Sequence, residues 1–206
     1  MFALIKREIW DQAVYFLAAI FLSLLFFAII VFGEQIQWRE IAPGLSIPLF
    51  IVLFIVFCMM GSSQMYSDRA GKISSLLSTL AVTRSRIFLA RIITGILVIL
   101  MSLLLMLVAM LVVLYYFSLP VHLFHRSIAE VSAMLFLTGL GCYCIGLQPG
   151  WTANKLMFFV DFAFLTPLFI TFVVIKGFDL EAIAILSLFD CLCLLRAYYR
   201  FLSTPL

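Results

Sequence analysis

Apolar runs of about twenty residues, separated by short polar breaks, recur along the whole 206-residue chain. An α-helix needs about 20 apolar residues to cross a hydrocarbon core of roughly 30 Å. Hydrophobic residues make up 66% of the chain and charged residues only 11%, which excludes an ordinary soluble domain. The runs are continuous rather than alternating, which favours helices over the strands of a membrane barrel. The pattern therefore predicts an all-α, polytopic integral membrane protein.

Six runs are long enough to be transmembrane helices, and they leave no room for a separate soluble domain. The predicted spans cover residues 14–32, 45–65, 87–117, 127–147, 152–175 and 180–195. Residues 1–206 are therefore expected to form a single transmembrane domain. Ahead of the first span, residues 1–12 place apolar side chains around Lys6 and Arg7, which indicates a helix lying in the membrane interface.

Basic residues fall mostly on one side of these spans. If both termini are cytoplasmic, ten of the 13 Lys and Arg residues lie inside and only Arg39, Arg126 and Lys176 lie outside. Cytoplasmic loops of membrane proteins carry such an excess of positive charge. The topology predicted from it places residues 66–91 inside and residues 33–44, 118–126 and 176–179 outside. Because the basic residues sort by membrane side, they form no continuous patch for nucleic acid.

Residues 66–91 are the only long polar, positively charged interruption between apolar runs, and they contain five Lys or Arg residues. Such a stretch must lie at a water interface rather than in lipid. Four apolar side chains in it are spaced to share one helical face, with serine and threonine around the rest. These four are Ile73, Leu76, Leu77 and Leu80. The spacing predicts a short amphipathic helix that docks a partner at the cytoplasmic surface.

Sequence signatures of catalysis are absent, including those of zinc proteases, nucleophile elbows, P-loops and dinucleotide-binding folds. The run Asp68-Arg69-Ala70-Gly71 superficially resembles intramembrane alcohol phosphotransferases. That chemistry needs further aspartates a few turns later, whereas the next acidic residue is Glu130. The chain is therefore not expected to be an enzyme, and no catalytic residue, metal site or cofactor of its own is predicted.

Two carboxylates fall inside predicted spans, where a charged group costs about 3 kcal/mol or more. Asp161 lies near the middle of the fifth span, and Asp190 lies in the sixth, closer to its cytoplasmic end. Each is expected either to line a transport path or to form a structural contact within the bundle. A basic partner such as Arg91, Lys155 or Arg196 is a structural alternative for Asp190.

Histidines and cysteines give weaker indications of a site. His122 and His125 would share a face if their segment is helical and could then form a small ligand site on the outer side, although simple solvation is the alternative. All five cysteines fall inside apolar runs. Small buried core residues are therefore favoured over metal or redox pairs.

The order of these elements resembles the permease subunits of type 2 ABC exporters. Those proteins have an interfacial helix, a first span, an outer turn with Pro-Gly, a second span and then a basic cytoplasmic coupling segment. In that segment an acidic residue and an Arg are followed by a Gly and then by a Leu. After a short break, the next span begins with basic residues. The matching residues here are Asp68, Arg69, Gly71, Leu76 and Leu77, then Val82 to Ser85, and finally Ala90 and Arg91. Leu80-Ala81 replaces the usual Thr-Pro, and Ser74 or Ser75 replaces a common Glu.

Among these permeases the chain is most similar to the haem exporter B subunits of cytochrome c maturation. The similarity covers Ile41 to Gly44 before the second span, the small residues of the fourth span, and Thr166-Pro167-Leu168 in the fifth. The total length also fits that branch.

The resemblance implies a transport subunit in a bacterial cytoplasmic membrane. ATP and Mg would be bound by a separate ABC ATPase, which grips residues 66–86 of this chain. A second permease copy, identical or different, would complete the complex within membrane lipid.

An apolar path with few charges favours an amphipathic or hydrophobic cargo, with a haem-related one among the possibilities. The alternatives are an assembly subunit that docks a partner without transport, or an integral-membrane enzyme. The residues assigned to ATPase coupling are Asp68, Arg69, Gly71, Leu76, Leu77 and Leu80, and those assigned to a transport path are Asp161 and Asp190.

Overall fold

The computed structural model describes residues 2–33, 42–71, 84–116, 121–148, 166–176 and 180–203. Nearly all of these residues are α-helical, which confirms the predicted all-α class for the described part of the chain. The helices in chain order are α1 (Phe2–Asp11), α2 (Ala13–Gly33), α3 (Ala42–Gly71), α5 (Arg84–Tyr116), α6 (Val121–Leu147), α8 (Thr166–Lys176) and α9 (Leu180–Ser203).

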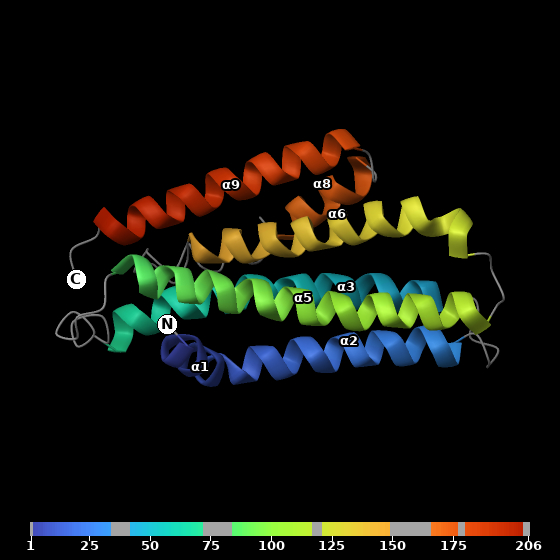
Figure 1. Cartoon of the computed structure of the whole chain (residues 1–206), viewed down its shortest axis with the longest axis horizontal. Helices are drawn as coiled ribbons and strands as arrows, with labels where there is room; N and C mark the ends of the chain where they lie inside the picture. The colour runs from blue at the N-terminus through green and yellow to red at the C-terminus, as the bar shows by residue number, and fades with distance from the viewer. Residues whose placement is uncertain are drawn as a thin grey trace.

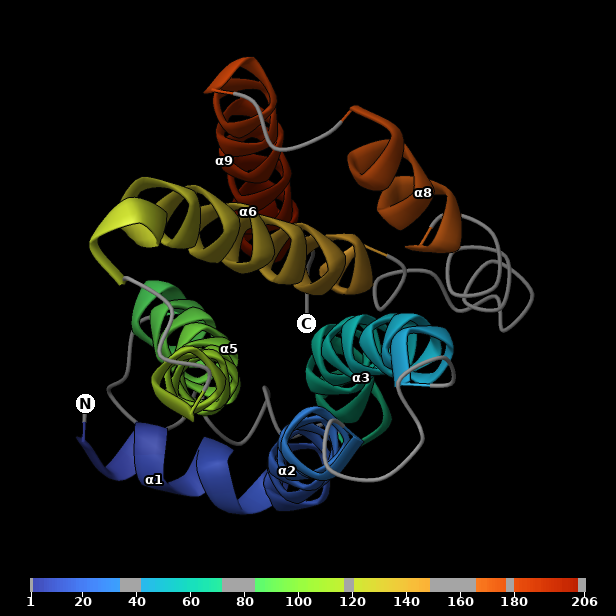
Figure 2. The ribbon, with the colours of Figure 1, turned by 90° about the vertical axis from the view of Figure 1, so that its right-hand side faces the viewer.

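The long helices run along one common direction (Figure 1), as expected for a membrane bundle. Viewed from the end, α6 crosses the middle, with α8 and α9 on one side and α3 and α5 on the other (Figure 2). Beyond α3 and α5 lie α2 and the short helix α1. The helix in the middle therefore contacts neighbours on both sides, whereas α1 and α9 lie at the periphery.

Helix length and composition are those of a multi-pass membrane protein. Within the described residues, four helices are long and apolar enough to cross a membrane. A fifth candidate is the pair α1 and α2, which meet at an angle of 71°. Of the predicted span at 152–175, only the residues of α8 lie within the described part of the chain. The predicted number of six spans therefore stays a prediction.

Three helices extend six or more residues beyond the limits predicted for their spans. Helix α3 continues to Gly71, α6 begins at Val121 rather than 127, and α9 continues to Ser203 rather than 195. Loss of hydropathy marks the edge of the apolar layer, whereas a helix continues for as long as its backbone hydrogen bonds can form. Residues 121–126, including His122 and His125, are therefore helical instead of forming a loop.

The helix ends sort into two groups. Helix α1 and the C-terminal end of α9 lie at the same end of the bundle as the last turn of α3 and the first turn of α5 (Figure 1). The last turns of α2 and α5 and the first turns of α3 and α6 lie at the opposite end. This is the arrangement that the predicted topology requires, because it places α1 and the C-terminal end of α9 on the side of the last turn of α3 and the first turn of α5. Which side faces the cytoplasm stays a prediction from the charge bias.

Glycines allow α3 and α6 to approach closely. A Cβ atom added at Gly61 would lie 2.5 Å from the carbonyl oxygen of Tyr143, and one added at Gly146 would overlap the carbonyl group of Cys58. Ser62 donates a hydrogen bond of 2.9 Å to the carbonyl oxygen of Gly146, across the contact. Small residues of α6 thus permit the close packing of two helices. Fully buried side chains around the contact are Leu53, Phe57, Cys58, Met60, Ile99, Tyr143 and Leu147.

Gly146→Ala should destabilise the bundle by about 1–3 kcal/mol, because the added methyl group would meet backbone that cannot move without separating α3 from α6. Gly139→Ala is the matched control on the same helix. Its nearest neighbours are side-chain atoms of Ile99 at 3.2 Å and Phe57 at 3.4 Å, which can shift. Thermal melting in detergent compares the two variants, and equal melting temperatures would contradict a close backbone contact at Gly146.

Candidate functional site

Three of the six residues predicted to dock an ATPase lie at the end of the bundle that carries both chain ends. Asp68, Arg69 and Gly71 are in the last turns of α3. Leu76, Leu77 and Leu80 lie outside the described residues. The structure thus gives the positions of the two helix ends that flank the undescribed part of the docking segment, namely the end of α3 and the start of α5.

Two turns into α5, Arg91 is buried at this same end of the bundle. Only 3% of the residue is exposed. Its Nε atom donates a hydrogen bond of 3.3 Å to Oε1 of Glu8 on α1. The two side chains therefore form an ion pair. The guanidinium carbon also lies 5.8 Å from the centre of the Phe201 ring on α9. A single cation therefore joins α1, α5 and α9.

Tyr143, on α6, connects Arg91 to α3. Its hydroxyl donates a hydrogen bond of 2.7 Å to Oε1 of Gln64 on α3. The backbone carbonyl oxygen of Arg91 lies 3.2 Å from the same hydroxyl. Tyr143 and Gln64 are almost completely buried. We refer to Glu8, Gln64, Arg91 and Tyr143 as the inner polar cluster.

A glycine on α5 creates the space for the Tyr143 ring. A Cβ atom added at Gly95 would lie 2.5 Å from the tip of that ring, so a larger residue would displace it. One turn before Gly95, the carbonyl group of Arg91 meets the Tyr143 hydroxyl. The local sequence of α5 thus supplies both the space for the ring and the partner for its hydroxyl.

The corner between α1 and α2 is tied to α3 as well. Gln12, only 4% exposed, occupies this corner. Its Oε1 atom accepts a hydrogen bond of 2.9 Å from the Ser63 hydroxyl on α3. Together with the pair of Glu8 and Arg91, this bond fixes both the position and the direction of α1 on the bundle. A displacement at the start of α5 would therefore reach α1 and α6 through direct polar contacts.

Arg91 is thus the partner of Glu8, and its suggested pairing with Asp190 is wrong. Asp190 lies near the middle of α9 rather than toward the end predicted to be cytoplasmic, and it is only 2% exposed. A Cβ atom added at Gly141 on α6 would lie 3.0 Å from Oδ1 of Asp190, so the carboxylate faces that glycine directly. Within the described part of the chain, neither carboxylate oxygen has a hydrogen-bond partner.

The remaining candidates have mixed outcomes. Asp161 and Lys155 lie outside the described residues. Cys58, Cys142 and Cys144 are buried as predicted, but Cys191 is exposed and Cys193 half-buried, because α9 lies at the periphery of the bundle. Among the described residues, no group of three or more His, Cys, Asp or Glu side chains could hold a metal ion.

Sequence analysis missed Glu8, Gln64 and Tyr143. An arginine embedded in an apolar run indicates that a carboxylate lies nearby, but nothing in the sequence singles out Glu8 among the ten acidic residues. No comparable signal identifies Gln64 or Tyr143, since their contact depends on how α3, α5 and α6 meet.

Comparisons of the chain with protein-family models, with curated proteins and with solved structures give no match. The functional argument therefore rests on the geometry of the bundle and on the sequence.

Glu8→Gln should lower the stability by about 2–3 kcal/mol, because it leaves the buried Arg91 cation without its carboxylate. Asp11→Asn is the matched control on the same helix. It removes the exposed ion pair of Asp11 with Arg7 at 3.6 Å and should cost less than about 0.5 kcal/mol. Thermal melting in detergent measures both effects. The double variant Glu8→Gln/Arg91→Met should recover part of the loss, and a melting temperature below that of either single variant would refute the pairing.

Asp190→Asn should leave the melting temperature equal to or above that of the wild type, since the substitution removes a buried charge that has no partner in the described part of the chain. Glu8→Gln, which removes a paired carboxylate, provides the contrast. A loss of more than about 1 kcal/mol in Asp190→Asn would show that the carboxylate is paired in the folded protein.

Proposed function

We propose that this chain is the membrane permease subunit of an ATP-binding cassette exporter in a bacterial cytoplasmic membrane. The observation that carries the proposal is the ion pair between Arg91 and Glu8. It joins α1 to α5 two turns after the start of α5. The segment proposed to dock an ATPase, residues 66–86, ends five residues before Arg91. A push on that segment would therefore move α1 and α5 together.

In this proposal, energy comes from a separate ABC ATPase that binds ATP and Mg and grips residues 66–86. Closure of the ATPase pushes the segment, and the ends of α3 and α5 carry the movement into the bundle. Through its carbonyl contact with Tyr143, Arg91 passes the displacement to α6. Both chain ends are placed on the cytoplasmic side, next to the ATPase.

The core of the described bundle favours a path between two permease copies over a path through one. Large side chains fill the space between α3, α5 and α6, among them Phe57, Ile99 and Tyr143. A cargo route through that space would have to separate helices that glycines hold in close contact. The proposed complex therefore contains a second permease copy, identical or different.

The proposed cargo is amphipathic or hydrophobic, and a haem-related molecule is the finer proposal that rests on the resemblance. Asp161 and Asp190 are the proposed polar residues of the path. Asp190 is buried against Gly141 of α6, and no described residue binds its carboxylate, so a path between two copies would reach it only if α6 and α9 separate. Transport of a fluorescent amphipathic cargo into proteoliposomes would test both residues through their Asn variants.

The docking role predicts that Leu76→Asp and Arg69→Glu lower recovery of the ATPase by at least about tenfold. Affinity purification of the tagged chain, followed by ATP turnover measurements in lipid nanodiscs, provides the test. Neither substitution places a charge within a predicted span, so insertion into the membrane should persist. Gln37→Asp, in the predicted outer loop, is the matched control and should leave recovery unchanged.

Two outcomes would contradict parts of this proposal. Normal ATPase recovery and turnover with both variants would refute the docking role of residues 66–86. An ATPase whose turnover depends on this chain, together with no movement of any cargo, would favour an assembly subunit over a permease.

A further inference from the structure

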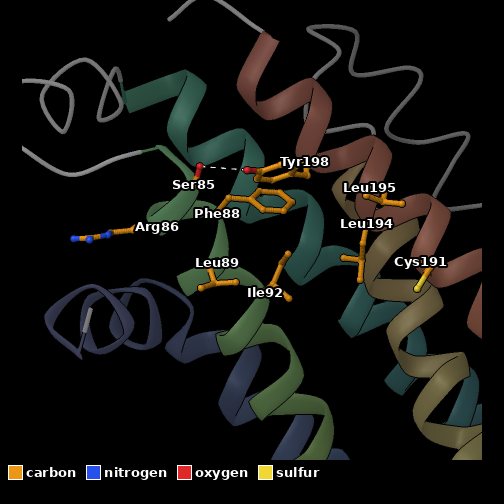
Figure 3. Close-up of a pocket in the computed structure, with 9 residues that line it drawn as sticks. All are labelled: Ser85, Arg86, Phe88, Leu89, Ile92, Cys191, Leu194, Leu195 and Tyr198. Carbon is orange, nitrogen blue, oxygen red and sulfur yellow. Dashed lines mark hydrogen bonds between the residues drawn. The ribbon is translucent and has the colours of Figure 1, made fainter.

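A groove of about 600 Å³ lies between α5 and α9, near the first turn of α5 and the last turns of α9 (Figure 3). It is open along its length rather than enclosed. The groove therefore belongs to the outer surface of the bundle, at the end that carries both chain ends. Its lining residues are Ser85, Arg86, Phe88, Leu89, Ile92, Cys191, Leu194, Leu195 and Tyr198.

The interior of the groove is apolar. Phe88, 3% exposed, forms part of its floor, and its ring centre lies 5.5 Å from that of Tyr198. Leu89 and Leu195 form the sides and are 48% and 63% exposed. The hydroxyls of Ser85 and Tyr198 lie 3.3 Å apart and form a hydrogen bond at one end of the groove. Such a lining suits a hydrocarbon chain and offers a polar ligand little to bind.

The mouth of the groove is positively charged. The side chain of Arg86 extends outward from the start of α5, away from the apolar floor (Figure 3). It is exposed and forms no ion pair with any residue that the structure describes. Guanidinium groups bind phosphate oxygens through paired hydrogen bonds. The groove therefore combines an apolar channel with an uncompensated cation at its polar end.

The groove lies at the end of the apolar part of α5, where the edge of the hydrocarbon layer is expected. Its α5 residues begin at Ser85, where the apolar part of that helix also begins, and its α9 residues lie within the apolar stretch Glu181–Ser203. An acyl chain entering from the bilayer would place its headgroup beside Arg86. Basic pockets between membrane helices on the cytoplasmic side bind anionic lipids in this manner.

We propose that the groove between α5 and α9 holds an acyl chain of an anionic phospholipid, whose phosphate binds Arg86. The bound lipid would bridge two helices that meet through Phe88, whose ring centre also lies 5.3 Å from that of Phe201 on α9. Phe201 in turn lies beside Arg91 of the inner polar cluster. Lipid binding would thus stabilise the start of α5.

Native mass spectrometry of the purified full chain in detergent provides the test. The probes are phosphatidylglycerol and phosphatidylcholine with the same palmitoyl and oleoyl chains. The wild type should bind phosphatidylglycerol about tenfold more tightly and should melt at a higher temperature in its presence. Arg86→Gln should abolish this preference, whereas Leu89→Trp should fill the groove and weaken binding of both lipids. Both residues are exposed, so neither change disturbs the core.

Two matched variants serve as controls. Arg196→Gln removes the same charge from the opposite face of α9, as the helical spacing from the lining residues shows. Leu100→Trp adds the same bulk to α5 at a residue that is 52% exposed and outside the groove. Both should retain the lipid preference of the wild type.

Three results would overturn the proposal. The first is equal binding of the two lipids by the wild type, or an unchanged preference in Arg86→Gln. The second is a rise in melting temperature with soluble glycerol phosphate that equals the rise with phosphatidylglycerol, since no acyl chain would then be needed. The third is a dimer that Leu89→Trp converts to a monomer without affecting lipid binding, because a second copy would then occupy the groove.

Discussion

The close approach of α3 and α6 is the interaction on which the rest of the bundle depends. Apolar side chains gain little by leaving lipid, so helices in a membrane associate where their backbones can come close and where polar groups can bond. Gly61 and Gly146 permit that approach, and Ser62 adds a hydrogen bond to the carbonyl oxygen of Gly146. The other helices surround this pair, with α5 and α9 packed against α6.

The inner polar cluster extends this contact to the periphery of the bundle. Tyr143 lies on the same helix as Gly146 and reaches Gln64 on α3 and the carbonyl oxygen of Arg91 on α5. From there, Arg91 reaches Glu8 on α1. Buried polar contacts of this kind are costly to break singly, so the helices that they join tend to move as a unit. This mechanical property, rather than any catalytic group, links the described structure to the proposed exporter.

The helical class and most helix positions could be predicted because hydropathy acts locally. The predicted first span at 14–32 differs from α2 by a single residue at each end. The helix ends at Gly71, Val121 and Ser203 could not be predicted in this way, since a helix can continue into water after its apolar part ends. The cluster could not be predicted either. Glu8 and Arg91 are 83 residues apart in the chain, and neither residue's neighbours indicate its partner.

The sequence by itself determined that this chain is helical and has the composition of a multi-pass membrane protein, because both properties depend on the residues within each segment and not on their distant partners. Only the tertiary structure decided that Arg91 pairs with Glu8 and that Asp190 faces Gly141. Only it placed a groove between α5 and α9. Partner choice in a bundle depends on the angle and rotation at which helices pack, and many side chains from distant parts of the chain set these jointly.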